Sequence, residues 1–332
     1  MTYLLFLLPV LLFGLLLLLL DSFKLIKTKT LLISSIWGLI SAWLSLRINV
    51  DLIDFSWLKF SDYSRYVAPL LEEFLKMAVF IYLIKKGKVG FMIDGAIYGF
   101  AAGALFSVFE NITYFMAYED MNIMVMIIRG FGTALMHGGC TAIILMFTMG
   151  SLNTKHRVFA ALAKGTLIAA VIHSGYNQLM FVVSPLWLTI AVVISIPLII
   201  MIVFMLNETG LRKWLDVELS QEVELLKMMR EGRLGQTKTG EYIISIKKNF
   251  SSEVIMDMMN YLRLYSELSL HAKKIILLKE TGFPVSRDEE TISKLAELKA
   301  LKKEIGQTGI IAISPVLRMS QKDIWKINML EA

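Results

Sequence analysis

The stretch YVAPLLEEFLKMAVFIYLIKK, residues 66–86, is apolar along most of its length but carries Glu72, Glu73 and Lys76 in its middle. Its length suits a helix that crosses a lipid bilayer once, which takes about 20 residues. An ionised side chain in the hydrocarbon costs on the order of 2 to 3 kcal/mol, so such residues need partners or a task. The stretch therefore predicts a membrane helix that contributes to a buried polar site.

The composition of the whole chain is that of a membrane protein with a polar tail. Of its 332 residues, 56% are hydrophobic and 19% are charged, and the mean hydropathy is +0.63. Soluble domains carry about 25% charged residues. Residues 1–206 hold 24 of the Asp, Glu, Lys and Arg residues, whereas the shorter stretch 207–332 holds 38. We therefore expect a transmembrane domain over residues 1–206 and a separate polar domain over residues 207–332.

The apolar runs predict an all-α, polytopic membrane protein with about seven transmembrane helices. The runs cover residues 2–20, 31–46, 66–84, 91–116, 123–149, 158–181 and 184–206. The first run has neither a basic segment before it nor a small-residue cleavage site after it, so we expect no removable signal peptide. Beyond residue 207, apolar residues recur at spacings of three and four, which predicts a helical C-terminal domain.

Basic residues alternate between the loops that join these runs, which predicts the orientation of the chain. The loops after the first, third, fifth and seventh runs carry the basic residues Lys24, Lys27, Lys29, Lys85, Lys86, Lys88, Lys155, Arg157, Arg212 and Lys213. The loops after the fourth and sixth runs carry none, and in the loop over 47–65 three basic residues are offset by three aspartates. The positive-inside rule then predicts an outer N-terminus and a cytoplasmic C-terminal domain.

Charge and cysteine content narrow the classes of partner. The formal net charge of +6 suits a protein that lies beside anionic lipid, and it gives no argument for a nucleic-acid partner. The lone cysteine, Cys140, excludes an intrachain disulfide. For the C-terminal domain we expect either a regulatory, dimerising or partner-binding role in the cytoplasm, or a small helical domain that only packs under the membrane part.

Polar residues recur inside four of the apolar runs and form a candidate site. They are Glu72, Glu73 and Lys76, then Glu110 and Asn111, then Arg129 and His137, then Lys164, His173 and Asn177, with Asp94 at the inner end of the fourth run. At about 1.5 Å per residue from the outer end of each run, Glu72, Glu110 and Arg129 lie about 9 Å deep. His173 comes out at about 12 Å and His137 at about 21 Å. We therefore expect one polar layer near the outer face.

The residue types in this layer suit hydrolysis. Two neighbouring carboxylates do not both ionise cheaply, so one can hold a proton while the other stays charged, which suits acid–base chemistry on water. Nearby histidines can bind a metal or donate hydrogen bonds to a developing oxyanion. Helical spacing of four pairs Glu72 with Lys76 and His173 with Asn177. The chain has no HExxH motif, although a Glu and two His from separate helices can still hold a metal.

Two other functions use the same residue types. The carboxylates and histidines can serve as a proton or cation relay in a transporter, or they can form a polar network that orients helices in a non-catalytic scaffold. Gly95, Gly99 and Gly103 recur at spacing four, and we interpret them as a stripe for close helix packing.

Four motifs resemble those of the PrsW-type intramembrane proteases. They are EEFLK (72–76), DGAIYGFAAGALFSVFENITY (94–114), RGFGTALMHGGCTA (129–142) and HSGYN (173–177), and together they cover about residues 60–180. These proteases are more distantly similar to the CAAX prenyl endopeptidase and Abi group. The resemblance implies that a peptide bond of a membrane-anchored protein is hydrolysed near the outer face of the membrane. An anti-sigma-factor-like regulator is the implied type of substrate.

The resemblance also implies roles for individual residues. The implied catalytic residues are Glu72, Glu73, Glu110, His137, His173 and Asn177, with Asn177 orienting a histidine or holding the oxyanion. The implied supporting residues are Lys76, Asn111, Arg129 and Asp94, of which Lys76 and Arg129 compensate buried charge. Both a glutamic and a metallopeptidase mechanism are open, and we favour the metal-free one. If zinc or another divalent metal takes part, Glu73, His137 and His173 are its expected ligands.

Overall fold

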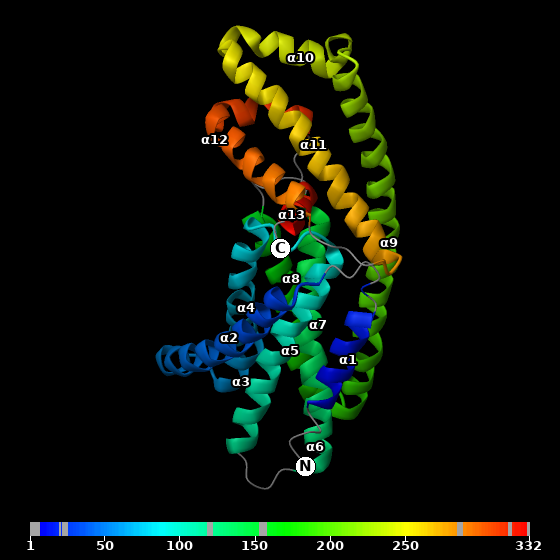
Figure 1. Ribbon diagram of the computed structural model, residues 1–332. Coiled ribbons are helices and arrows are strands. Elements are labelled where there is room, and N and C mark those ends of the chain that lie inside the picture. The colour runs from blue at the N-terminus through cyan, green and yellow to red at the C-terminus, as the bar shows by residue number, and fades with distance from the viewer. Residues whose placement is uncertain are drawn as a thin grey trace. The chain divides into compact units, whose positions relative to one another are not determined.

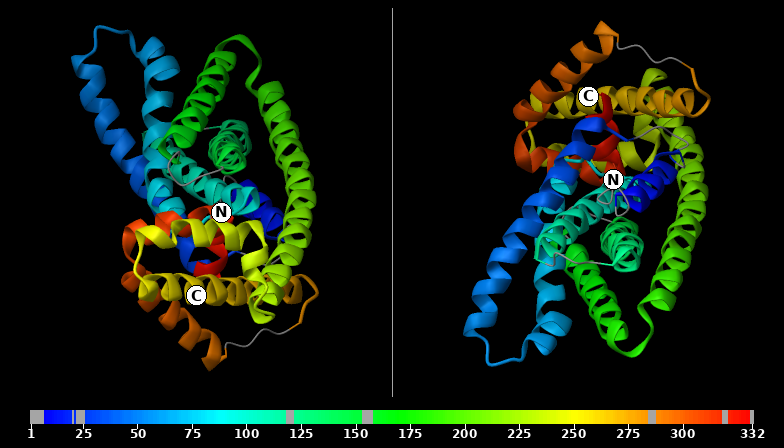
Figure 2. Two further views of the ribbon diagram at one scale, coloured as in Figure 1. Left: turned by 90° about the horizontal axis from the view of Figure 1, so that it is seen from above. Right: turned by 90° about the horizontal axis from the view of Figure 1, so that it is seen from below.

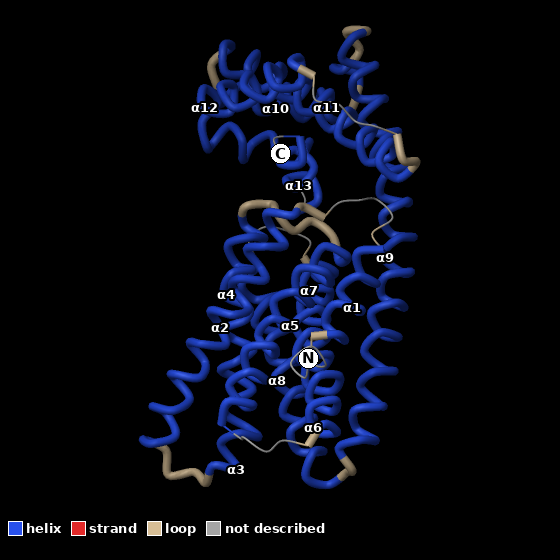
Figure 3. Tube along the Cα trace, turned by 60° about the horizontal axis from the view of Figure 1, so that its bottom comes forward, coloured by secondary structure: helices blue, strands red, loops and turns tan. Residues whose placement is uncertain are grey.

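The structure is a computed structural model that describes residues 7–19, 21, 26–117, 122–152, 158–283, 288–317 and 321–330. Helices are the only regular elements among these residues, and none of them forms a strand (Figure 3). The predicted all-α class is therefore confirmed. The chain forms two compact units, Met1–Asn207 and Glu208–Ala332, which are described in turn. Of the basic loop residues, Lys24, Lys155 and Arg157 lie outside the described part of the chain.

The N-terminal unit is built from the expected apolar helices and two π-helical turns. Its elements are α1 (Leu8–Leu19), α2 (Thr28–Phe55), α3 (Phe60–Asp62), the π-helix η2 (Tyr63–Val67), α4 (Ala68–Lys85), α5 (Met92–Ala117), α6 (Ile123–Ile128), the π-helix η3 (Arg129–Thr133), α7 (Ala134–Ser151), α8 (Val158–Val182) and the first part of α9 (Pro185–Arg230).

Five helical segments of the described chain are long and apolar enough to cross a membrane. They are Thr28–Phe55, Met92–Ala117, Ile123–Ser151, Val158–Val182 and Pro185–Leu206. The other two expected runs are helices as well: α1 is described over 12 residues, and α4 carries the three central charges. The predicted end of the second run at residue 46 is wrong. The helix continues to Phe55, because residues 47–55 include no glycine or proline that would break it.

Helices α5 and α7 lie side by side in the middle of the N-terminal unit (Figure 1). The predicted glycine stripe is the reason they approach so closely. A Cβ on Gly99 would lie 2.7 Å from the backbone oxygen of Thr141, and one on Gly103 would lie 2.7 Å from the hydroxyl of the same residue. The packing role of the stripe is therefore confirmed. Around this pair, α2 packs on α5, α8 packs on α7, and α4 contacts both α2 and α8 (Figure 2).

The turn between α4 and α5 is fixed by backbone hydrogen bonds at the C-terminal end of α4. Gly87 has a φ of +61°, a left-handed conformation that favours glycine. The N–H of Lys88 donates to the carbonyl of Leu83 at 2.8 Å and the N–H of Gly87 to that of Ile84 at 2.9 Å, as in a Schellman cap. This cap ends α4 sharply, so that the chain can reverse into α5.

The C-terminal unit is helical, as predicted. Beside the last part of α9 it contains the 3₁₀-helix η5 (Leu234–Gln236), α10 (Lys238–Ile246), the 3₁₀-helix η6 (Lys247–Asn249), α11 (Ser252–Glu280), α12 (Glu289–Leu317) and α13 (Gln321–Leu330). α11 packs against α12 and α13. α12 bends at Gly306, whose φ of +71° interrupts the helical backbone.

Candidate active site

Helices α4, α5, α7 and α8, together with η3, bring eight of the ten predicted site residues into one connected cluster. They are Glu72, Glu73, Lys76, Glu110, Asn111, Arg129, His137 and His173. Asn177 and Asp94 are not part of it. Residues up to 101 positions apart in the sequence are therefore neighbours, which only the packing of the helices achieves.

Glu73 and Lys76 form the buried centre of the cluster. Nζ of Lys76 donates to Oε1 of Glu73 at 2.8 Å, and neither side chain is exposed. Helical spacing favoured Glu72 as the partner of Lys76, but the structure pairs Lys76 with Glu73. Both carboxylates are within one turn of Lys76, and the tertiary surroundings decide between them: the ammonium lies 4.1 Å from the ring centre of Phe106, where it also reaches His137.

The proton of His137 is assigned by its neighbours. Nδ1 lies 2.6 Å from Nζ of Lys76, which can only donate. In its neutral form His137 therefore carries the proton on Nε2, which lies 2.9 Å from Oε2 of Glu110. The predicted greater depth of His137 is wrong, because His137 and Glu110 lie at one level. The described helical run that carries His137 extends about 10 Å farther beyond this level than the described part of α5, since His137 is 14 residues from Ile123 and Glu110 only seven from Ala117.

His173 has the opposite arrangement. Its Nδ1 lies 3.0 Å from Oε1 of Glu73, an acceptor, so Nδ1 carries the proton. In the neutral form of His173 this leaves the lone pair on Nε2, which faces Oε2 of Glu72 at 3.9 Å. The rings of His137 and His173 stand 4.6 Å apart at 82°. One histidine thus presents an N–H and the other a lone pair to the same side of the cluster.

Glu110 lies at the more open edge of the site. Its Oε1 accepts from the guanidinium of Arg129 at 3.0 Å, and Nε of Arg129 donates to Oδ1 of Asn111 at 3.0 Å. Arg129 belongs to η3, and wide π-helical turns recur at functional sites. The side chain of Glu110 is 39% exposed, that of Glu72 16% and that of Glu73 0%. Of the three carboxylates, Glu110 therefore has the most exposed side chain.

Asn177 lies next to the site but contacts backbone. Its Nδ2 donates to the carbonyl of Ser64 at 3.0 Å, and the hydroxyl of Ser174 donates to the carbonyl of Arg65 at 2.5 Å. Both acceptors belong to η2, and Pro69, five residues after Ser64 and four after Arg65, has no N–H to donate to them. Glu73, and not Asn177, orients His173. The sequence reasoning missed Ser174, although its spacing of three from Asn177 puts both on one face of α8.

Asp94 lies at the other end of α5. Its Oδ2 accepts from the backbone N–H groups of Gly90 at 2.9 Å and of Phe91 at 3.3 Å, so it caps the turn that leads into the helix. Sixteen residues separate Asp94 from Glu110, which corresponds to about 24 Å along α5. The structure thus gives this residue a capping position, away from the cluster.

The cluster contains a donor set for a divalent cation. Glu72, His137 and His173 each offer one ligand atom, and these atoms lie within 4.8 Å of one another. One carboxylate with two histidines is the ligand set of catalytic zinc in several peptidases. Oε2 of Glu73 is buried without a hydrogen-bond partner among the described residues. The residues therefore fit a divalent cation. The carboxylate of this donor set is Glu72 and not the expected Glu73, because Oε1 of Glu73 is already bound to Lys76 and His173.

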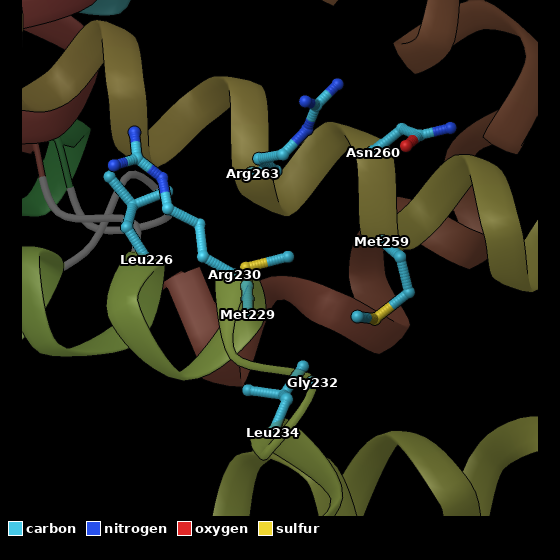
Figure 4. Close-up of a pocket in the computed structure, with 8 residues that line it drawn as sticks. All are labelled: Leu226, Met229, Arg230, Gly232, Leu234, Met259, Asn260 and Arg263. Atoms are coloured by element: carbon cyan, nitrogen blue, oxygen red, sulfur yellow. The ribbon is translucent and has the colours of Figure 1, made fainter.

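The C-terminal unit has a separate pocket of about 460 Å³ (Figure 4). Apolar side chains from α9, α11 and the turn after α9 line it, and it also carries Arg230 and Arg263. Figure 4 shows these two arginines on neighbouring helices, with their guanidinium groups extending away from Leu234. The pocket has no carboxylate or histidine, so its chemistry differs from that of the membrane cluster.

The fold and the cluster together define a class of protein: a multi-helix membrane protein with carboxylates and histidines gathered in one cluster between its helices. The profile of the PrsW family, described as "PrsW family intramembrane metalloprotease", matches residues 27–206. Because this match covers more than half of the chain, the chain belongs to the PrsW family and is an intramembrane protease. Comparisons with curated proteins and with solved structures found no match.

Proposed function

We propose that the protein cleaves a membrane-anchored protein near the outer face of the membrane, with a divalent cation such as zinc bound by Glu72, His137 and His173. The observation that carries this proposal is the pair of carboxylates around His173. Glu73 accepts a hydrogen bond from Nδ1–H of His173, and Nε2 of the same ring faces Glu72. A carboxylate behind a histidine is the usual device for aiming that histidine at a metal. The family description supports this choice over the metal-free mechanism that the sequence favoured.

Glu73 and Lys76 are positioning residues in this proposal. Glu73 is too deeply buried to meet a peptide, and its negative charge is balanced by Lys76 at 2.8 Å. Its task is to fix the ring of His173 in the orientation and tautomer that binding needs. To ligate through Nε2, His137 must carry its proton on Nδ1, so its contact with Lys76 has to rearrange when a cation binds.

Glu110 is the proposed acid–base group. It is the most accessible carboxylate of the cluster, and Arg129 holds it in place. It takes a proton from water as the water oxygen bonds to the peptide carbon, and it gives that proton to the leaving amine as the C–N bond breaks. A bound divalent cation would supply Lewis-acid polarisation of the scissile carbonyl. Arg129 keeps Glu110 from turning away between these two transfers.

The proposed substrate is a membrane-anchored regulator of the anti-sigma-factor type. Its cleavage near the outer face agrees with the predicted orientation, in which the basic loops and the C-terminal unit are cytoplasmic. In that orientation Glu72, Glu110 and Arg129 belong to the outer half of their helices. A cytoplasmic partner with acidic groups would suit the pocket at Arg230 and Arg263, because two guanidinium groups attract carboxylates.

The test is a comparison of membrane-protein fragments in cells that express the wild type, Glu72→Gln or His173→Ala. We expect new outer-face termini in single-pass proteins with the wild type and none with either variant. The same three proteins, purified, are assayed for bound metal. A set of termini that is identical in all three strains would overturn the proposal.

A further inference from the structure

An apolar groove of about 550 Å³ runs along the seam between α4 and α8, apart from the charged cluster. Small side chains form part of its lining: Ala78, Ala163 and Thr166. Large ones rise beside them, and Phe74 and Phe159 are 57% and 64% exposed. No charged residue lines the groove. It therefore suits an apolar occupant that comes from the lipid.

The groove follows α4 and α8, two of the helices that carry the cluster. Along α4 its lining reaches from the level of Val67 to Ile81, about 21 Å of helix rise, which is most of the hydrocarbon thickness of about 30 Å. Leu71 in the lining directly precedes Glu72. The faces of α4 are thus divided: residues such as Phe74 and Ala78 border the groove, while Glu73 and Lys76 point into the protein.

Two hydrogen bonds close the outer end of this seam. Ser174 of α8 donates to the carbonyl of Arg65, and Asn177 of α8 donates to the carbonyl of Ser64, both in η2 directly before α4. We call these two hydrogen bonds the Ser174–Asn177 clasp. Behind this clasp, His173 is 3% exposed and Glu73 is fully buried. A peptide that comes from the groove would reach His173 and Glu72 when these two bonds open, without any change in the α5–α7 core.

We propose that the groove between α4 and α8 receives the transmembrane helix of the substrate, and that opening of the Ser174–Asn177 clasp admits its outer end to the cluster. This inference rests on the proposed function. A transmembrane substrate can arrive only from the side, through lipid. The small residues favour a helix over a lipid chain as occupant, because they let a second helix backbone come close, and a flexible chain has no such need.

The first test fills the groove. Ala78→Trp and Ala163→Trp are compared with Ala191→Trp, a substitution at an exposed alanine of α9 outside the groove. The readout is the set of fragments that disappear with Glu72→Gln. We expect both groove variants to lower these fragments at least about tenfold, and Ala191→Trp to leave them unchanged. Unchanged fragments in the groove variants would overturn the docking site alone, whereas the absence of any Glu72-dependent fragment would overturn the proposed function.

The readout of the second test depends neither on cleavage nor on whether the fold tolerates a tryptophan in the groove. A single cysteine at Ala163, in a Glu72→Gln background, is paired with cysteines placed one by one along the transmembrane helix of a substrate found in the first test. The native Cys140 is buried, so it does not compete. We expect disulfides at every third to fourth substrate position. Crosslinks that are equally frequent with a cysteine at Ala191 would mean that lipid fills the groove, and would overturn the inference.

Discussion

Nζ of Lys76 lies 2.6 Å from Nδ1 of His137, so a cation on α4 decides which nitrogen of a histidine on α7 carries the proton. The same ammonium pairs with Glu73, and Glu73 in turn accepts from His173. Lys76 therefore connects the two histidines through one buried network. The charge of Lys76 therefore stabilises the buried site and also sets the protonation of the histidines.

Lys76→Met should destabilise the protein. It leaves the carboxylate of Glu73 buried without its cation, and the loss of one partner of a buried pair costs about 3–5 kcal/mol. The measurement is thermal unfolding of the purified protein in detergent. The control is the double variant Glu73→Gln/Lys76→Met, which removes both charges and should recover much of the loss. A double variant that is as unstable as the single one would contradict this account of the pair.

Glu72→Gln and Glu73→Gln should differ in kind. Glu72 pairs with no cation in the described structure, so Glu72→Gln should keep the unfolding temperature and lower cleavage at least about 100-fold. Glu73→Gln should lower the unfolding temperature as well, because Lys76 loses its counter-charge. Unfolding curves and cleavage are measured on the same preparations. If the two glutamines have the same effect on stability, the division of roles between the glutamates is wrong.

Removal of metal should abolish cleavage reversibly. Dialysis against a chelator should remove about one divalent cation per chain, and adding zinc back should restore both occupancy and cleavage. His173→Ala and Glu72→Gln should hold little metal, whereas Asn177→Ala, which contacts only backbone, should hold as much as the wild type. Elemental analysis of the purified proteins gives the occupancy. Full cleavage by metal-free protein would favour the glutamic mechanism instead.

Gly103→Ala should displace His137 by pushing α5 and α7 apart. The added methyl group would meet the hydroxyl of Thr141 at 2.7 Å and the backbone of His137, so α5 and α7 must separate. Overpacking of this kind costs about 1–3 kcal/mol, and it moves His137 away from Lys76 and Glu110. Gly175→Ala is the matched control, because no atom lies within 4 Å of its added carbon. Stability and cleavage should both fall for Gly103→Ala, and both should stay unchanged for Gly175→Ala.

Asn177→Ala distinguishes a clasp from an oxyanion donor. Loss of its hydrogen bond to Ser64 should cost about 0.5–1.5 kcal/mol of stability and change cleavage by less than about tenfold. Loss of an oxyanion donor would lower cleavage about 100- to 1000-fold. The rate at saturating substrate is the deciding measurement, and a drop of the larger size would return Asn177 to the catalytic centre.

Much of the fold could be predicted from the sequence, because hydrophobic runs and glycine spacing act locally. Gly99 and Gly103 signalled a close helix contact through their spacing, although only the structure identifies α7 as the partner. The polar residues on four runs likewise indicated one site. The level of His137 could not be predicted by counting, because helices that cross one bilayer do not begin at a common height.

The partners within the site could not be predicted, because they depend on the third dimension. Helical spacing allows Lys76 to meet either glutamate, and only the position of His137 on α7 favours Glu73. Asn177 is within one turn of His173, but η2 presents free carbonyls on the other side. Pro69 signals in the sequence that carbonyls one turn before it lack a helical donor, but only the structure shows that Ser174 and Asn177 supply one.

The charges of α4 also bear on how the protein is made. This helix does not reach the apolar level of the five spanning segments, since Glu72, Glu73 and Lys76 stand in its centre. At about 2.5–3.5 kcal/mol for each charge, it cannot partition into lipid by itself. His137 and His173, which contact Lys76 and Glu73, are synthesised 61 and 100 residues later. We therefore expect α4 to enter the bilayer together with α7 and α8 and not on its own.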